Sequence, residues 1–423
     1  MISKLIFGDC AELRSEKIDP KLSQDCFYVG LEHIEQQSLS LSGHGLGSDV
    51  DSQKQKFYKG DILFGKLRPY FRKVVVAPFD GICSTEIWVV KPKAGIDRNF
   101  VFYWMASEEF INSSTFASEG GRMPRAKWDW VSKFLLPNLG ASRQSVIGQT
   151  LGALDEKIEI NKRLSKTLEN IAQTVFKSWF LDFDPVKAKM AGEEPFGMDA
   201  ATAKLFPAFL EDSELGLIPA GWACDVAKNI FDITIGRTPP RKEPEWFCGG
   251  DAGVPWVSIR DMGTFSTYSN STNEGLTQAA VSKFRVPLVP EGAVLMSFKL
   301  TVGKLCITDR PLVTNEAIAH FVIPSNSKVT NYFAYLWLSN YDMNSLDSTS
   351  SIGTATNSGV IKGIRFLIPG RAAMQAFSTI CAPIFSQIRN IVHENDSLAS
   401  LRDSLLPRLI SGELHISEEM LVS

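Results

Sequence analysis

The sequence predicts a mixed α/β protein in which two globular domains, related by a pseudo-two-fold axis, are joined by two long helices that form an antiparallel coiled coil. Three observations predict this fold. Strand-like and helix-like segments are mixed in both halves of the chain, the two halves repeat each other, and each half ends in a helical stripe of apolar residues. The length of 423 residues also exceeds that of one ordinary domain.

Both halves combine short strands with helices. Runs rich in β-branched and aromatic residues, bounded by glycine and proline, predict strands at residues 73–76, 86–90 and 319–323. Helices are expected near residues 98–111 and 330–340. This mixture places both halves in the α/β class.

An internal repeat relates the two halves. Gly60 and Gly292 lie 232 positions apart, and each precedes an apolar run. Other segments keep this spacing or one close to it: Tyr28-Val29 with Trp256-Val257, Glu86-Ile87 with Glu316-Ala317, Asn99-Phe100 with Asn331-Tyr332, and Phe134-Leu135-Leu136-Pro137 with Phe366-Leu367-Ile368-Pro369. A repeat of this length indicates a duplicated domain.

Each half closes with a helical stripe whose residues recur at alternating steps of four and three. This is the pattern of a coiled-coil seam. The positions expected to form the seam are Leu154, Ile158, Asn161, Leu168, Val175 and Trp179 in the first helix and Ile388, Ile391, Leu398 and Leu405 in the second. A helix over residues 144–180 would be about 55 Å long, more than one small domain can cover, so we favour a partner helix over packing on its own domain.

Two equivalent helices that pack about a perpendicular two-fold axis must run antiparallel. The polar seam residues Asn161, Ser165 and Asn395 cost stability but could fix the register of the pair. Pro383 lies near the start of the second helix and could kink it, because proline lacks an N–H and its ring disrupts the helical ladder.

These patterns divide the chain into six segments. The predicted segments are a first domain (1–142), a first coiled-coil helix (143–181), a connector (182–215), a second domain (216–370), a second coiled-coil helix (371–412) and a tail (413–423). The connector carries prolines, glycines and an acidic run, but also Phe196, Phe206 and Phe209. Because a flexible linker would lack such aromatic groups, we expect the connector to dock on a domain.

Positive charge is local in this chain, whose formal net charge is -3. Lysine and arginine can neutralise phosphates, and arginine can hold guanine with two hydrogen bonds, so basic loops suit nucleic-acid binding; on charge alone, a solvated charged face is equally favoured. The candidate contact residues are Lys66, Arg68, Arg72, Lys73, Arg122, Arg125 and Lys127 in the first half, and Arg237, Arg241, Lys299, Lys304, Lys362, Thr354 and Asn357 in the second. In the second half, Glu243 and Glu245 offset part of the charge.

Sequence signatures of catalysis and of cofactor binding were not found. There is no GxxxxGK[ST] phosphate loop and no methyltransferase tetrapeptide of the Asn/Asp-Pro-Pro-Tyr type. The five histidines have no metal-ligand spacing, so no metal site is expected, and His320 is favoured as a satisfied core or edge residue. Glu86 and Glu316 occupy equivalent places in the repeat, and separate structural hydrogen bonds are favoured over a paired role.

The compartment is expected to be the cytoplasm. No run of about 18 apolar residues occurs, and the first residues do not have the pattern of a signal peptide, so no membrane association is expected. The seven cysteines are scattered without a CxxC pair, which favours free and mostly buried thiols.

Three stretches of the sequence resemble one family. The run from Leu154-Asp155-Glu156-Lys157 to Phe183-Asp184-Pro185-Val186 is similar to the central conserved region of the specificity subunits of type I restriction-modification systems. Gly236-Arg237-Thr238-Pro239 resembles the opening of a target recognition domain of that family, and Leu405-Leu406-Pro407-Arg408 belongs to a stretch that resembles its C-terminal ending. The first half lacks the Gly-x-Thr-Pro opening and has a divergent Cys10-Ala11-Glu12-Leu13 region instead.

The resemblance implies a non-catalytic, sequence-specific DNA-binding subunit. Two target recognition domains would each read one half of a split double-stranded DNA sequence, and the two helices would set the unread gap. Two modification subunits, which bind S-adenosylmethionine and methylate adenine, would assemble on this chain. Restriction subunits that use ATP and magnesium can join such complexes, and the chain itself would hold no cofactor.

One alternative from a different class stays open. A two-headed scaffold could bind other proteins through its coiled coil and have no role on DNA. Duplex binding that weakens steeply with salt distinguishes the two, because phosphate contacts release counterions. An autonomous methyltransferase or nuclease is disfavoured by the motifs that are missing.

Overall fold

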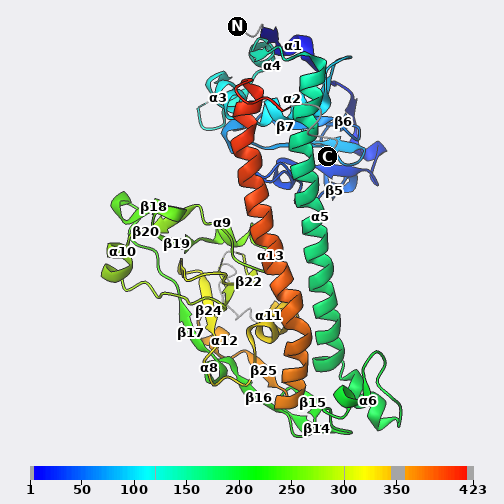
Figure 1. The fold of residues 1–423 in the computed structure, drawn as a ribbon, viewed down its shortest axis with the longest axis vertical. Coiled ribbons are helices and arrows are strands. Elements are labelled where there is room, and N and C mark those ends of the chain that lie inside the picture. Colours follow the sequence, from blue (N-terminus) through cyan, green and yellow to red (C-terminus); the bar gives the residue numbers. More distant parts are fainter. Residues whose placement is uncertain (1–3, 120, 300, 344–357, 417–423) are drawn as a thin grey trace. The chain divides into compact units, whose positions relative to one another are not determined.

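The computed structural model describes residues 4–119, 121–299, 301–343 and 358–416. The chain forms two compact units, the first made of Met1–Glu159 with Asp396–Ser423 and the second of Ile160–Asn395. Each unit contains part of both long helices, α5 (Gly140–Phe180) and α13 (Arg371–Ile410), which are drawn in green and orange-red (Figure 1). The boundary between the units falls within each long helix, after Glu159 in α5 and after Asn395 in α13. It therefore does not test the six segment boundaries given above, which stay a prediction.

The first unit is built around a sheet of order β2-β10-β7-β8 and a second sheet of order β3-β6-β9-β4-β5. Their strands are β2 (Ala11–Leu13), β3 (Lys17–Ile18), β4 (Phe27–Val29), β5 (Gly45–Leu46), β6 (Lys54–Phe57), β7 (Ile62–Gly65), β8 (Val74–Val76), β9 (Gly81–Cys83) and β10 (Ile87–Pro92). Two-stranded pairs are formed by β1 (Lys4–Ile6) with β13 (Leu135–Pro137) and by β11 (Ser118–Glu119) with β12 (Arg125–Ala126). The short helices are α1 (Phe7–Cys10), α2 (Arg98–Ala106), α3 (Glu108–Phe116) and α4 (Trp128–Val131).

The second unit is built around a sheet of order β17-β24-β21-β22 and another of order β18-β20-β19-β23. Their strands are β17 (Asp232–Ile235), β18 (Phe247–Gly249), β19 (Val254–Val257), β20 (Glu274–Leu276), β21 (Val294–Ser297), β22 (Leu305–Ile307), β23 (Val313–Thr314) and β24 (Ile318–Val322). The pairs are β14 (Leu210–Ser213) with β15 (Gly216–Pro219) and β16 (Ala223–Val226) with β25 (Arg365–Ile368). The helices are α6 (Asp184–Met190), α7 (Ala200–Ala203), α8 (Ala227–Ile230), α9 (Ile259–Met262), α10 (Gln278–Lys283), α11 (Asn331–Ser339) and α12 (Ser358–Lys362).

The central sheets of the two units have the same strand order, as the sequence repeat predicts. The antiparallel order β2-β10-β7-β8 corresponds strand for strand to β17-β24-β21-β22. A parallel pair lies in the other sheet of each unit, where β4 pairs with β9 and β19 pairs with β23. The predicted mixed α/β class with two similar domains and long helices is therefore confirmed.

The repeated glycines have a conformational reason. Gly60 has a φ of 92° and Gly292 a φ of 79°, which are left-handed values that cost an L-residue energy. Their N–H groups donate to Ala77 at 2.9 Å and to Thr308 at 2.8 Å, and both turns lead directly into the strand that starts a hairpin. The glycine in each half is thus required by the turn that starts β7 or β21.

The long helices run in opposite directions in both units. In the second unit, the Asn161 amide donates to Asn395 at 3.0 Å, while Phe176 packs on Phe377 with ring centroids 6.0 Å apart. In the first unit, Arg402 forms an ion pair with Asp155 at 2.6 Å. Lower-numbered residues of α5 therefore face higher-numbered residues of α13, and α13 continues through Pro383 as one helix.

The residues expected to form the seam are all buried or half-buried. Asn161 is 1% exposed, and its amide also donates to Glu394 at 2.9 Å, so the polar position is satisfied. The buried seam positions are Ile158, Asn161, Trp179, Ile388 and Ile391, and the half-buried ones are Leu154, Leu168, Val175, Leu398 and Leu405.

The connector packs against the rest of the second unit, in agreement with its aromatic content. Phe206 is buried and packs against Trp179 and Trp222, with ring centroids 5.1 and 6.1 Å apart. Phe196 and Phe209, in contrast, are exposed. All seven cysteines are free, as expected, and within the described ranges every helix is too short or too polar to cross a bilayer.

His320 lies in the core of the second unit on β24. Its two ring nitrogens lie 2.8 Å from the Thr234 hydroxyl and 2.7 Å from the Thr314 hydroxyl. Burial lowers the pKa of His320 from 6.5 to about 4. The structure therefore confirms a satisfied core histidine, which stays neutral at physiological pH.

This histidine predicts an acid-sensitive fold. His320 takes up a proton near pH 6.5 in the unfolded chain but only near pH 4 in the folded one. Its neutral form therefore contributes fully to the free energy of unfolding above pH 6.5, and this contribution is lost as the pH falls towards 4. We expect the free energy of unfolding to fall by about 2 kcal/mol between pH 7 and pH 5. Chemical denaturation at both pH values should show a clearly smaller fall in His320→Gln. An equal fall in both proteins would contradict the assignment.

Candidate nucleic-acid interface

Two basic segments that are distant in sequence lie side by side in the first unit. We call residues 66–73 and 121–127 the paired basic segments. The Ala126 N–H donates to Lys66 at 2.9 Å, and the Arg68 N–H donates to Pro124 at 2.8 Å. The Arg68 guanidinium also donates to the Arg122 carbonyl at 3.3 Å. The sequence indicated both segments, and the structure joins them into one surface.

The first of these segments is the tip of the β7–β8 hairpin and has an unusual backbone. Arg68 and Arg72 have φ values of 51° and 50°, and they flank a single 3-10 turn, Pro69–Phe71. Left-handed backbone costs a residue with a Cβ about 1 kcal/mol, so this conformation is held by its surroundings. It leaves Tyr70 44% exposed, two residues away from both Arg68 and Arg72.

Several of the predicted contact side chains are already engaged inside the first unit. The Lys73 ammonium donates to the Leu31 carbonyl, and burial lowers the pKa of Lys73. The Arg72 guanidinium donates to Ala106 at 2.9 Å, and Arg125 forms an ion pair with Glu86 at 2.9 Å. These three side chains hold the loops in place. Arg122 and Lys127 are exposed, while Lys66 is half-buried.

A pocket of about 620 Å³ opens beside the paired basic segments. Lys66, Arg125 and Lys127 contribute cations to its lining, and Trp88 and Trp128 contribute rings whose centroids are 5.5 Å apart. Cationic groups attract phosphates, and aromatic faces can stack on bases or sugars. The two tryptophans were not among the candidate residues, although Trp128 directly follows Lys127.

The second unit places its predicted basic residues differently. Arg241 bonds to both carboxylate oxygens of Glu274, at 2.8 and 2.9 Å, and lies over the Trp256 ring at 4.5 Å. The carboxylate that pairs with Arg241 is thus Glu274 of β20, which is distant in sequence, and not the neighbouring Glu243 or Glu245. The Arg237 guanidinium donates to the Phe284 carbonyl at 3.1 Å.

The other candidates of the second unit lie on a hairpin and a short helix. Lys299 follows β21 and Lys304 precedes β22, so both belong to the hairpin tip that corresponds to residues 66–73. Lys362 is exposed at the end of α12. Thr354 and Asn357 lie outside the described residues.

The equivalent glutamates have the structural role that was favoured. Glu86 holds Arg125 in the first unit, and Glu316 accepts a hydrogen bond from the Thr238 hydroxyl in the second. Each carboxylate thus fixes a segment that carries a candidate contact residue.

Comparison with known proteins shows what the first part of the chain is similar to. Residues 7–170 match the family described as the type I restriction modification DNA specificity domain. Over most of its length the chain is similar to specificity subunits of type I restriction enzymes. It is 29% identical over 415 residues to the type I restriction enzyme HindI specificity subunit of Haemophilus influenzae, covering 86% of this chain and 89% of that protein.

Two further proteins are also similar to this chain. The type I restriction enzyme MjaIX specificity subunit of Methanocaldococcus jannaschii is 25% identical, with 86% of this chain and 79% of that protein covered. The crystal structure of the type I restriction-modification system S subunit from M. genitalium has a TM-score of 0.52 at 14% identity, covering 98% of this chain and 96% of that one. The latter shows that the fold is shared.

The paired basic segments predict two kinds of effect on DNA binding. If these segments bind DNA, Lys66→Ala and Arg122→Ala should each weaken duplex binding and reduce the slope of log affinity against log salt by about one, because each would remove one phosphate contact. Tyr70→Ala should weaken binding with little change in slope, because stacking releases no counterions. Fluorescence titrations at several salt concentrations measure both. Lys17→Ala, an exposed lysine of the same unit, is the control, and an unchanged slope in both basic variants would refute the interface.

Proposed function

We propose that this chain is the DNA-reading specificity subunit of a type I restriction-modification complex and reads a bipartite target with one domain per half-site. The observation that carries the proposal is the duplicated topology, in which β2-β10-β7-β8 corresponds to β17-β24-β21-β22. The first copy lies within the matched specificity domain, residues 7–170. A second domain with the same strand order is suited to the same task on a second sequence.

The two domains would read their half-sites with different chemistry. The first offers the paired basic segments with Tyr70 exposed at the hairpin tip. In the second, Arg241 is neutralised by Glu274, and the equivalent hairpin tip carries Lys299 and Lys304. Arginine and lysine at such tips can reach base edges or phosphates in the major groove.

The long helices would set the distance between the half-sites. α5 has 41 residues and α13 has 40, and residues of both helices belong to both units. A helix rises about 1.5 Å per residue and B-DNA about 3.4 Å per base pair, so two residues correspond to roughly one base pair of gap. An antiparallel pair of this kind can act as a rigid spacer.

Catalysis would belong to partner subunits. Two modification subunits that bind S-adenosylmethionine and methylate adenine would assemble around this chain, and restriction subunits that use ATP and magnesium can join them. The related proteins named above are specificity subunits, which supports a non-catalytic role for this chain. The partners would also complete the DNA clamp, so the net charge of -3 is compatible with DNA binding.

Methylome sequencing tests the proposal directly. A host that carries this chain with its modification subunit should contain a bipartite motif with methylated adenines and one fixed gap. Deleting the coding sequence of this chain alone should abolish that methylation. A continuous motif, or methylation that persists without this chain, would refute the proposal.

Lengthening both helices should widen the gap. One heptad inserted after Ile158 in α5 and one after Leu398 in α13 lengthens the coiled coil by about 10 Å and keeps the seam residues of the two helices facing each other. The gap should therefore grow by about three base pairs. The half-sites should stay the same in the methylome. A heptad in α5 alone is the control, because it displaces Asn161 from Asn395 and should reduce methylation. An unchanged gap after the double insertion would refute the spacer role.

A further inference from the structure

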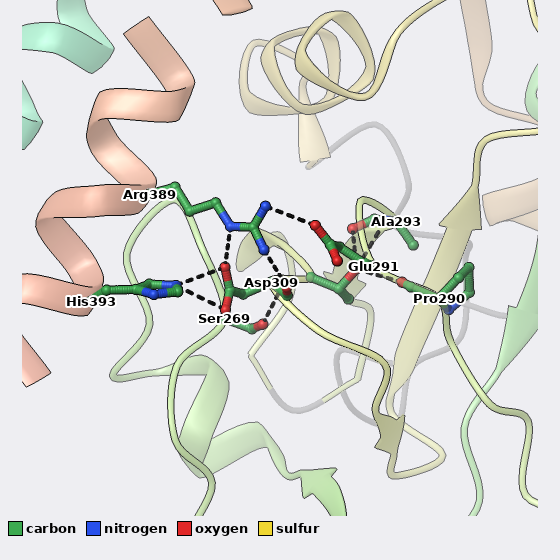
Figure 2. Close-up of polar contacts among 8 residues, drawn as sticks. Ser269, Pro290, Glu291, Ala293, Asp309, Arg389 and His393 are labelled. Carbon is green, nitrogen blue, oxygen red and sulfur yellow. Dashed lines mark hydrogen bonds and ion pairs between the residues drawn. The ribbon is translucent and has the colours of Figure 1, made fainter. Parts of the chain in front are cut away.

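Arg389 of α13 holds two loops of the second domain (Figure 2). Its Nε lies 2.5 Å from Asp309 Oδ1, and its Nη2 donates to the Asp309 carbonyl at 2.7 Å. Its Nη1 lies 2.7 Å from Glu291 Oε1. A planar guanidinium that bonds in three directions fixes orientation as well as distance.

The two loops that Arg389 holds are bonded to each other. The Thr308 hydroxyl donates to the Pro290 carbonyl at 2.7 Å and accepts from the Ala293 N–H at 2.9 Å. The Asp309 N–H donates to the Ser269 hydroxyl at 2.9 Å, and the His393 ring lies 3.0 Å from the Asp309 carboxylate. Arg389 therefore binds two loops that are already hydrogen-bonded to each other.

These loops form the root of the β21–β22 hairpin. Glu291 lies in the turn that starts β21, and Asp309 follows the end of β22. The opposite end of the same hairpin is the tip with Lys299 and Lys304. A contact that fixes the root of a short antiparallel hairpin also fixes the direction in which its tip points.

The first unit holds its equivalent hairpin by another route. Asp61, in the turn that starts β7, forms an ion pair with Arg14 at 2.8 Å, and Arg14 follows β2 of the same domain. In the second unit the corresponding root is attached to the long helix itself. The second hairpin is thus coupled to the coiled coil by a polar contact at its root.

Apolar packing also attaches the second domain to α13, but it is less directional. Tyr332 of α11 stacks on Phe385 of α13 with ring centroids 4.5 Å apart, and Phe333 packs near Phe377. Hydrophobic contact is non-directional and permits small rotations about the contact line. The Arg389 contacts lie at the hairpin root and would oppose such a rotation.

We propose that Arg389, through Asp309 and Glu291, is a positioning residue that sets the angle of the second reading hairpin on α13, and so enforces the gap length between half-sites. This inference rests on the proposed bipartite function. Loss of the contacts leaves the base-contacting side chains themselves unchanged but lets the hairpin tip that carries them shift along the DNA. Selectivity between gaps then falls, while the preferred half-site sequences stay the same.

The test uses the assembled modification complex and duplexes that carry the two half-sites found by methylome sequencing, with the natural gap or a gap one base pair shorter or longer. Arg389→Ala should lower the ratio of affinities for the natural and altered gaps by about fivefold, as expected for losing a small ion-pair network. Glu291→Gln removes one contact and should lower the ratio less. Arg389→Lys should recover it only in part, because an ammonium is a single point charge.

Arg371→Ala is the matched control, because it removes an exposed arginine from the same helix and should leave the ratio unchanged. Thermal unfolding identifies a variant that fails to fold, in which case Glu291→Gln decides. An unchanged ratio in a folded Arg389→Ala or Glu291→Gln complex overturns the inference. A wild-type complex without any bipartite motif instead refutes the proposed function, before the variants are compared.

Discussion

The register between α5 and α13 depends on polar side chains buried in their seam. Asn161 bonds to Asn395 and Glu394, and Arg402, which is 3% exposed, forms an ion pair with Asp155. Apolar seam residues alone tolerate a shift of one heptad, because one leucine replaces another. A shift would leave these polar groups buried without partners, which costs several kcal/mol for a charged group. The polar contacts thus select one register.

The register also determines where each domain is attached, because residues of both helices form part of the domain cores. Tyr103 of α2 donates to Asp155 at 2.5 Å in the first unit, and Tyr335 of α11 donates to Glu169 at 2.7 Å in the second. These tyrosines are 232 positions apart and occupy equivalent places in the repeat. Each domain is therefore attached to α5 through the same kind of contact, and Asp155 links the first domain to both helices at once.

Much of the fold could be predicted because its signals are local or periodic. The repeated Gly60 and Gly292 mark turns that need positive φ. Apolar residues that recur at steps of four and three along the helices indicate which positions form the seam. The destinations of individual cations could not be predicted. The residues that surround Arg125 and Arg241 in the sequence do not distinguish a paired arginine from a solvent-exposed one. Their partners Glu86 and Glu274 are distant in sequence and are brought close only by the tertiary fold.

The two hairpins show how one topology can support two reading surfaces. In the first unit, Arg68 and Arg72 have left-handed backbone, and the hairpin tip contacts residues 121–127. The root of this hairpin is held within the domain by Arg14. In the second unit, the tip is shorter and the root is held by Arg389 on α13. Sequence changes at a tip can alter which bases are read without disturbing the root. Separation of tip and root therefore allows specificity to change while spacing is kept.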